Sequence, residues 1–222
     1  MPVSDLFPPQ VVVVEAVGAP VATPLPAAEY KAVSTSVDVR RLEFAATRAC
    51  ARRALDRLGI RDAVLPKDKW GSVSWPEGVI GSLTHCPERR AAAVAWSGCS
   101  GLTSLGLDLE VHCPLPPGVL ALVALPEEEA QLRALKRLQP TVHWDSLLFS
   151  AKEAVYKAWH PICRTSLEFH DVSVTFDRAG AFTAEVIRDG RAAVSGGALI
   201  GGRWALVGSH IATGVTVGQA SV

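Results

Sequence analysis

Two carboxylates stand two residues apart in the stretch "LGLDLEV", at Asp108 and Glu110. Because a β-strand alternates its side chains, both acids should lie on one face, with the aliphatic residues on the other. Neighbouring carboxylates in a strand otherwise built for burial repel each other and lose hydration, a cost that a hard cation such as Mg²⁺ cancels. An edge strand with both acids in water explains the pattern equally well.

A second charged group lies in "FSAKEAVYKAWHP", residues 149–161. Glu153 and Lys157 are four apart, so they are neighbours on one side of a helix. An exposed ion pair worth only about 0.3–0.5 kcal/mol is the ordinary explanation. The alanines around these charges favour a more specific one, in which Glu153 joins the two strand acids as a third metal ligand. Lys152 and Lys157 would then be available for phosphate.

Phosphate-binding groups are indicated at two further places. In "GSLTHC", Ser82 and Thr84 share a strand face and His85 follows, and all three can donate to phosphate; the alternative is a polar strand end. An arginine run can bind phosphate with bidentate geometry, or can simply be the solvated face of a helix. Its members are Arg40, Arg41, Arg48, Arg52 and Arg53, and Lys67 and Lys69 could extend it.

Periodicity predicts the elements that must position these groups. A helix is expected at 38–58 and another from about His143 to His160, ended by Pro161, with a third at 125–138. An edge strand is expected near 11–17. The other expected strands lie at 79–85, 91–96, 104–111, 170–176, 181–187, 191–196, 203–208 and 211–217, with a hairpin at "RDGR". The chain thus divides into two α+β halves, 1–105 and 106–222, within one globular body.

Composition excludes several classes of protein. The 22 basic and 22 acidic residues balance, which argues against a nucleic-acid protein held by bulk electrostatics. The five cysteines form no CxxC pair, so neither a disulfide framework nor a zinc site is indicated. No signal peptide, membrane span, P-loop, GxSxG or dinucleotide motif is found, and a cytoplasmic protein is expected. Structural or surface roles are assigned to His112, His143, His160, His170 and His210.

In order along the chain, "GSLTHC", "LGLDLE" and "FSAKEAVYKAW" resemble the motifs of the 4'-phosphopantetheinyl transferases. The closest type is the single-chain one that serves polyketide and non-ribosomal peptide carrier proteins. The resemblance runs from about Arg40 to Trp159. It implies a pseudo-twofold α+β fold with the active site in the cleft between two similar halves, and a monomer. It also implies transfer of 4'-phosphopantetheine from coenzyme A to a carrier-protein serine, with Mg²⁺, or Mn²⁺ in its place, and release of 3',5'-ADP.

The resemblance also assigns roles to residues. Asp108, Glu110 and Glu153 would hold the metal, and Glu153 would act as general base for the carrier serine, directly or through a water. Lys157 would stabilise or protonate the leaving phosphate, and Lys152 would contact the pyrophosphate. The remaining coenzyme contacts implied are Arg40, Arg48 and His85 to the 3'-phosphate, Lys67 near the nucleotide and Ser82 near the phosphates.

The sequence departs from the family pattern in the loop "KWGSVSWP", where relatives read Gly-basic-Pro. In addition, Leu109 cannot ligate the metal, so a water should fill any position that an acid takes in some relatives. Two alternatives stay open: another Mg²⁺-dependent enzyme acting on a nucleotide or phosphoester, and a non-catalytic module that binds coenzyme A or a carrier protein. The apolar run 116–129 is a candidate docking surface for the carrier, although plain core packing is the stronger explanation.

Overall fold

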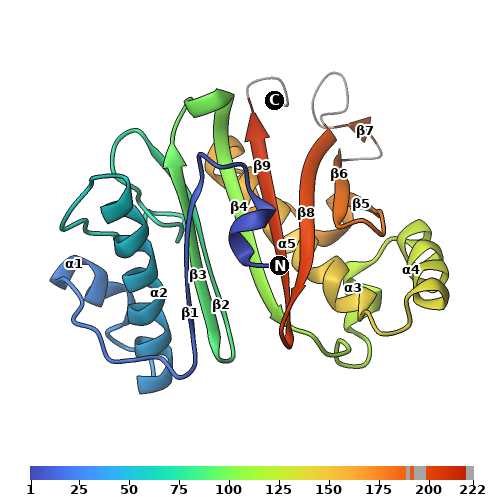
Figure 1. Ribbon diagram of the computed structural model, residues 1–222, viewed down its shortest axis with the longest axis horizontal. Coiled ribbons are helices and arrows are strands. Elements are labelled where there is room, and N and C mark those ends of the chain that lie inside the picture. Colours follow the sequence, from blue (N-terminus) through green and yellow to red (C-terminus); the bar gives the residue numbers. More distant parts are fainter. Residues whose placement is uncertain (189–190, 193–198, 219–222) are drawn as a thin grey trace.

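Two long helices and two antiparallel sheets dominate the part of the chain that the computed structural model describes, residues 1–188, 191–192 and 199–218 (Figure 1). In the first half, helix α2 packs on a sheet of strand order β1-β3-β2. The bounds are η1 Val3–Leu6, β1 Val12–Val17, α1 Ala27–Tyr30, η2 Lys31–Val33, α2 Asp38–Arg57, β2 Val79–Cys86, β3 Arg89–Trp96 and η3 Cys99–Gly101.

The second half repeats this arrangement with a larger sheet, of order β4-β9-β8-β6-β5, on which helix α5 packs. The bounds are β4 Leu102–Val111, α3 Val119–Val123, α4 Pro126–Leu138, α5 Trp144–Cys163, η4 Phe169–Asp171, β5 Val172–Phe176, β6 Ala181–Arg188, β7 Arg191–Ala192, β8 Leu199–Val207 and β9 His210–Gly218. The predicted α+β fold is confirmed. The sequence divided the chain after residue 105, which falls inside β4, and that division stays a prediction.

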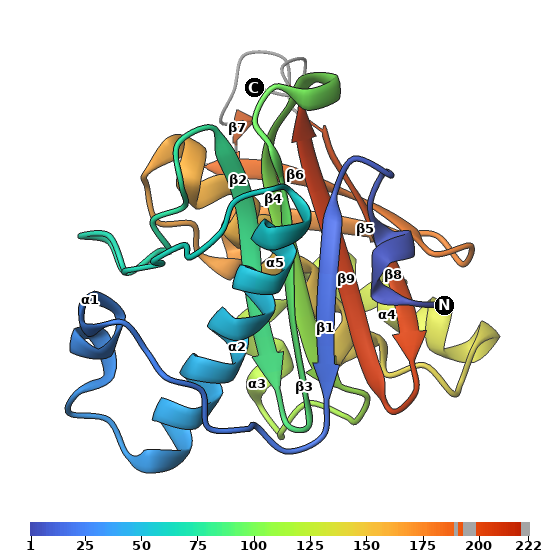
Figure 2. The same ribbon diagram turned by 60° about the vertical axis from the view of Figure 1, so that its left-hand side comes forward.

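Strand alternation separates the core into layers. One face of β3 presents Ala92 and Val94 to α2, while the other joins the leucines of β4 in a cluster that the N-terminal segment also enters. The opposite face of β4, which carries Gly106 and Asp108, is turned toward α5. Both long helices therefore border the region where β2 and β4 run side by side, as Figures 1 and 2 show.

The two sheets meet at this seam through side-chain hydroxyls. The Ser82 hydroxyl oxygen on β2 accepts from the backbone N–H of Leu107 at 3.0 Å. The Thr84 hydroxyl oxygen accepts from the N–H of Leu109 at 3.2 Å. Because an N–H buried without a partner is costly, these hydroxyls do for β4 what a neighbouring strand's carbonyls would otherwise do.

Most predicted elements are confirmed, including the N-terminal edge strand, the helices at 38–58 and 125–138, and the strands through β4. The predicted end of α5 at Pro161 is wrong, because the helix continues to Cys163. In the last turn a proline removes only one hydrogen bond from a helix that is about to end. Arg164 then takes a left-handed conformation, φ 54°, with its N–H donating to the carbonyl of His160.

Among the later strands, β5, β6, β8 and β9 are confirmed, although β8 begins at Leu199, before the predicted position 203. The expected strand at 191–196 is described only as β7, and the turn of the "RDGR" hairpin lies outside the described residues. None of the helices in the described ranges combines the length and apolarity needed to cross a bilayer.

Candidate active site

A cleft of about 490 Å³ opens between α2 and α5, above the seam of β2 and β4. Two of its walls are charged with opposite sign: basic groups come from α2, β2 and the loop before β2, and carboxylates come from β4 and α5. Of the residues that the sequence singled out, it brings together Arg40, Arg48, Lys67, His85, Asp108, Glu110, Glu153 and Lys157. Five segments of the chain, namely α2, the loop before β2, β2, β4 and α5, thus converge on one site.

The β4 carboxylates lie on one face of the strand, as its alternation predicts. Asp108 is 3% exposed, and Leu107 and Leu109 on the opposite face are fully buried. The alternative of a solvent-facing edge strand is therefore wrong: β4 ends its sheet, but β2 and α5 cover it. A buried carboxylate needs a positive partner or hydrogen bonds, and the cleft supplies both.

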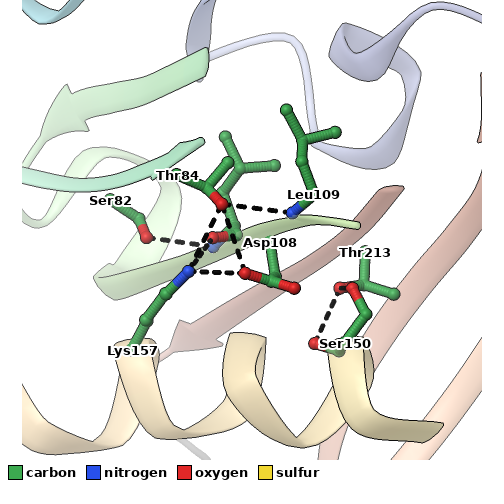
Figure 3. Close-up of polar contacts among 8 residues, drawn as sticks. Ser82, Thr84, Asp108, Leu109, Ser150, Lys157 and Thr213 are labelled. Atoms are coloured by element: carbon green, nitrogen blue, oxygen red, sulfur yellow. Dashed lines mark hydrogen bonds and ion pairs between the residues drawn. The ribbon is translucent and has the colours of Figure 1, made fainter. Parts of the chain in front are cut away.

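That partner is Lys157, whose ammonium donates to Asp108 Oδ1 at 2.6 Å (Figure 3). The same oxygen accepts from the Thr84 hydroxyl at 3.2 Å, and Lys157 also reaches the carbonyl of Leu107 at 3.3 Å. The second carboxylate oxygen, Asp108 Oδ2, is buried with no hydrogen-bond partner among the described residues. Asp108 therefore keeps an unused ligand atom inside the cleft.

Helix α5 comes this close to β4 because the residues between them are small. A Cβ on Gly106 would lie 1.9 Å from the carbonyl oxygen of Ala154, so only glycine fits. Ser150, one turn earlier on α5, bonds Thr213 on β9 through both its hydroxyl and its carbonyl, each at 2.9 Å (Figure 3). These contacts fix the position of α5 along β4, and with it where Glu153 and Lys157 lie relative to Asp108 and Glu110.

The electrostatics of the cleft disfavour three separate negative charges. Burial, together with the charge of Asp108, raises the pKa of Glu110 to about 7. Burial also raises the pKa of Glu153, and the charge of Asp108 adds to this effect while the Lys157 ammonium opposes it. Because adjacent carboxylates share one small volume, added positive charge would favour the ionised form of each.

The donor chemistry of this set fits a hard divalent cation. Three carboxylates line one cleft, and Asp108 Oδ2 is buried and unpaired. The carboxylates are not gathered around one point, however: within the described ranges no three His, Cys, Asp or Glu side chains are close enough to hold a metal ion. Lys157 lies against Asp108 Oδ1 instead, so holding a cation requires the three carboxylates to draw together around the unpaired Asp108 Oδ2.

The opposite wall of the cleft offers donors to an anion. Arg40 Nη1 lies 2.7 Å from His85 Nε2 and must be the donor, so that imidazole nitrogen carries no proton. Burial and the charge of Arg40 lower the pKa of His85. Arg48 is buried and its Nε donates to the carbonyl of Leu65, while its Nη2 has no partner among the described residues.

Several other predicted groups have their charge or hydroxyl used elsewhere. Arg41 and Arg52 pair with Asp38 and Glu29, so the arginine run does not form a single patch. Burial lowers the pKa of Arg48 to about 10, and the nearby Glu29 opposes the shift. The sequence placed Ser82 near the phosphates. Its hydroxyl lies at the seam and lines a neighbouring hollow of about 650 Å³, whereas Thr84 lines the cleft.

Lys152 does not reach the cleft. The family resemblance implied a pyrophosphate contact for Lys152, yet its side chain is 1% exposed and its ammonium donates to three protein acceptors. These are Glu128 Oε2 at 2.7 Å and the carbonyls of Val123 and Phe169, both at 2.8 Å. Since an ammonium has three protons, none is left for a phosphate in this conformation.

Sequence reasoning missed the apolar part of the cleft, which Phe44, Val73, Leu83 and Phe149 line. One signal was present: Phe149 precedes Glu153 by four residues, as Glu153 precedes Lys157, so the three form one stripe along α5. In the run 116–129, Val123 is buried but Leu122 is 71% exposed, so core packing accounts for only part of it.

The loop before β2 ties the two halves together beside the cleft. Asp68 Oδ1 accepts from the N–H groups of Trp70 and Ser72, each at 2.9 Å, which closes a tight turn. Its Oδ2 accepts from Arg164 at the end of α5 at 2.8 Å. The Ser72 hydroxyl also lies 3.0 Å from Nδ1 of His160, a histidine that the sequence left without a specific partner.

Comparison with known proteins gives consistent matches along the chain. Residues 28–95 match a family model described as the 4'-phosphopantetheinyl transferase N-terminal domain, and residues 104–205 match the model of the 4'-phosphopantetheinyl transferase superfamily. The chain is 46% identical to the 4'-phosphopantetheinyl transferase Svp of Streptomyces mobaraensis, over 83% of this chain and 75% of that protein. It is 39% identical to PptT of Mycobacterium tuberculosis, over 88% of this chain and 86% of that protein.

Proposed function

Because the chain belongs to the 4'-phosphopantetheinyl transferase superfamily, we propose that it transfers 4'-phosphopantetheine from coenzyme A to a serine hydroxyl of an acyl or peptidyl carrier protein. The reaction depends on Mg²⁺, for which Mn²⁺ can substitute, and releases 3',5'-ADP. The observation that carries the proposal is the pairing, across one cleft, of the carboxylates and Lys157 with the basic groups of the opposite wall.

The carboxylate side of the cleft performs the chemistry. Asp108, Glu110 and Glu153 would hold Mg²⁺, which supplies positive charge against the pyrophosphate of coenzyme A. Glu153 takes the proton of the carrier serine, directly or through a water, and its raised pKa suits a general base. The serine oxygen forms a bond to the phosphorus that bears pantetheine, and the bond from that phosphorus to the bridging oxygen of the pyrophosphate breaks.

Lys157 handles the charge that develops on the leaving 3',5'-ADP. Its ammonium lies on the same helical stripe as Glu153, one turn further along α5. A cation positioned before the reaction stabilises a developing phosphate charge without reorganisation at the moment of transfer. For this role Lys157 must exchange Asp108, its partner at 2.6 Å, for a phosphate oxygen.

The basic wall binds the nucleotide end of coenzyme A. Arg40, Arg48 and His85 contact the 3'-phosphate, for which the unpaired Arg48 Nη2 and the exposed Arg40 guanidinium are suitable donors. Lys67 lies near the nucleotide, beside the ring of Phe44 at 5.8 Å. The partners are carrier proteins or carrier domains of fatty-acid, polyketide or peptide synthases. A monomeric state and a cytoplasmic location remain predictions from the sequence.

The proposal is tested by the intact mass of an apo carrier protein after incubation with this protein, coenzyme A and Mg²⁺. We expect a mass increase equal to one phosphopantetheine, lost with a chelator and absent when the carrier serine is replaced by alanine. Coenzyme A binding without any mass increase, across fatty-acid, polyketide and peptide carriers, would instead support a non-catalytic binding module. Turnover of coenzyme A without a carrier would support a different phosphoester enzyme.

A further inference from the structure

A buried ion pair lies directly behind the catalytic face of α5. The Lys152 ammonium and the Glu128 carboxylate are each 1% exposed and 2.7 Å apart. Burial lowers the pKa of Lys152, and the hydrogen bond that Lys152 donates to Glu128 opposes the shift. Taking two charges out of water is costly unless every donor and acceptor is satisfied, so the surrounding contacts decide what this pair can do.

Those contacts are complete and reach five chain segments. Glu128 Oε2 accepts from the N–H of Leu125, and Oε1 accepts from the N–H of Val174 on β5, both at 2.7 Å. Lys152 donates to the carbonyl of Val123, at the end of α3, and to that of Phe169 in η4. The pair therefore fastens α5 to α3, to the start of α4, to η4 and to β5.

The direction of Lys152 on the helix follows from its position. Consecutive residues of an α-helix point about 100° apart, so Lys152 cannot share the stripe of Glu153 and Lys157. Glu153 faces the cleft, whereas Lys152 faces α4 and η4. A small pocket of about 200 Å³ lies beside this part of α5 and is lined by Lys152, Glu153 and residues 166–169.

We infer that Glu128 and Lys152 are positioning residues, which set the rotation of α5 and thereby the place of Glu153, and that Lys152 does not contact phosphate. The inference rests on the proposed function, since it concerns what Glu153 needs in order to act. It assigns a role to Glu128, and it replaces the pyrophosphate contact that the family resemblance implied for Lys152.

The first test uses the unmodified protein, so it does not depend on how well a variant folds. Lysines are labelled briefly with acetic anhydride, with and without coenzyme A, and labelling is read by peptide mass spectrometry. We expect Lys152 to stay unlabelled in both samples, while exposed Lys136 on α4 is labelled equally in both. Labelling of Lys152 that coenzyme A suppresses would overturn the inference. Lack of protection at Lys67 and Lys157 would count against the proposed function instead.

The second test is a double-mutant cycle with Lys152→Met and Glu128→Gln. Each single change leaves a buried polar partner uncompensated, so the melting temperature should fall by about 10 °C. The double variant should lose less than the sum of the singles, because the two residues act through each other. Lys136→Met is the matched control and should leave the melting temperature unchanged.

Kinetics and binding separate positioning from phosphate contact. With folded variants, the Kd for coenzyme A by calorimetry should stay within about threefold of the original, whereas kcat falls in the single variants and partly recovers in the double variant. A direct phosphate contact is a charge-assisted hydrogen bond, so its loss should weaken coenzyme A binding by tenfold or more. That result in Lys152→Met, with no change in Glu128→Gln, would overturn the inference.

Discussion

Glu153 is the residue on which the proposed chemistry depends most directly, because it lines the cleft from α5 together with both acids of β4. Glu153→Gln keeps the shape of the side chain but removes the base. We expect the transfer rate to fall at least a hundredfold, which is the lower end of what general-base catalysis contributes. Coenzyme A binding, measured by calorimetry, should change little. Transfer at the original rate would exclude Glu153 as the base.

Glu110 gives the metal-free protein a dependence of stability on pH. Its pKa of about 7 when folded exceeds the ordinary value of 4.5, so between those pH values the folded state holds more protons than the unfolded state. The free energy of unfolding should therefore fall as pH rises from about 5 to 7, by at most about 3 kcal/mol.

Urea denaturation in a chelator between pH 5 and 8 measures this slope. Glu110→Gln should remove most of it and leave the protein more stable above pH 7, and the exposed Glu127→Gln serves as the control. An unchanged slope in Glu110→Gln would show that another group is responsible.

The sequence predicted where the side chains of Asp108 and Glu110 lie, but it did not predict where the side chain of Lys152 lies. Strand alternation is a fixed geometric rule, so "DLE" was enough to place Asp108 and Glu110 on one face. Lys152 follows the family motif, but the motif does not say which helix face meets the cleft. Its acceptor Glu128 belongs to three consecutive glutamates in the first turn of α4, where acidic residues are ordinary, so nothing marked it as buried.

The contact between α5 and β4 is the element-scale feature that assembles the site. Gly106→Ala would place a methyl group 1.9 Å from the carbonyl oxygen of Ala154, so the helix must move away from the strand. Such overpacking costs about 1–3 kcal/mol, and the shift should also separate Lys157 from Asp108 and slow transfer.

Gly201→Ala on β8 is the matched control, since a Cβ there meets nothing within 4 Å. Urea midpoints and transfer rates of the two variants should differ clearly. Equal stability and equal activity would mean that the close approach of α5 is not needed.

Element types were largely predictable, because periodicities of 2 and 3.6 residues survive in the sequence. The ends of the elements were less predictable. Helix α5 continues past Pro161 to Cys163, because a proline in the last turn disturbs only a helix that is about to end. The hydroxyl seam could not be predicted either. "GSLTH" is typical of an ordinary strand, and nothing local indicates that its hydroxyls will accept from backbone N–H groups of β4.

The ion pair of Arg164 with Asp68 joins the two halves of the molecule. Arg164→Gln should break the link to Asp68 without disturbing the turn that Asp68 Oδ1 holds. Because the pair is partly exposed, we expect its ion-pair energy to be only about 0.2–1 kcal/mol. If that energy is lost from the free energy of coenzyme A binding, the KM for coenzyme A should rise by up to about fivefold, with kcat unchanged.

Arg133→Gln removes another exposed ion pair, with Glu129 on α4, and is the control. A fall in kcat at constant KM would contradict a role for this link in shaping the coenzyme cleft. The link joins residues 68 and 164, and a separation of that size leaves no local pattern from which it could have been predicted.

The seam between the sheets also makes the two halves separately observable. The amide groups of Leu107 and Leu109 donate to the hydroxyl oxygens of Ser82 and Thr84, whereas the ladder of β4 with β9 protects the strand on its other side. If the halves part while each sheet stays intact, these two amides exchange with deuterated solvent before their neighbours in the ladder. Hydrogen exchange at two leucines would then report how often the cleft opens to admit its substrates.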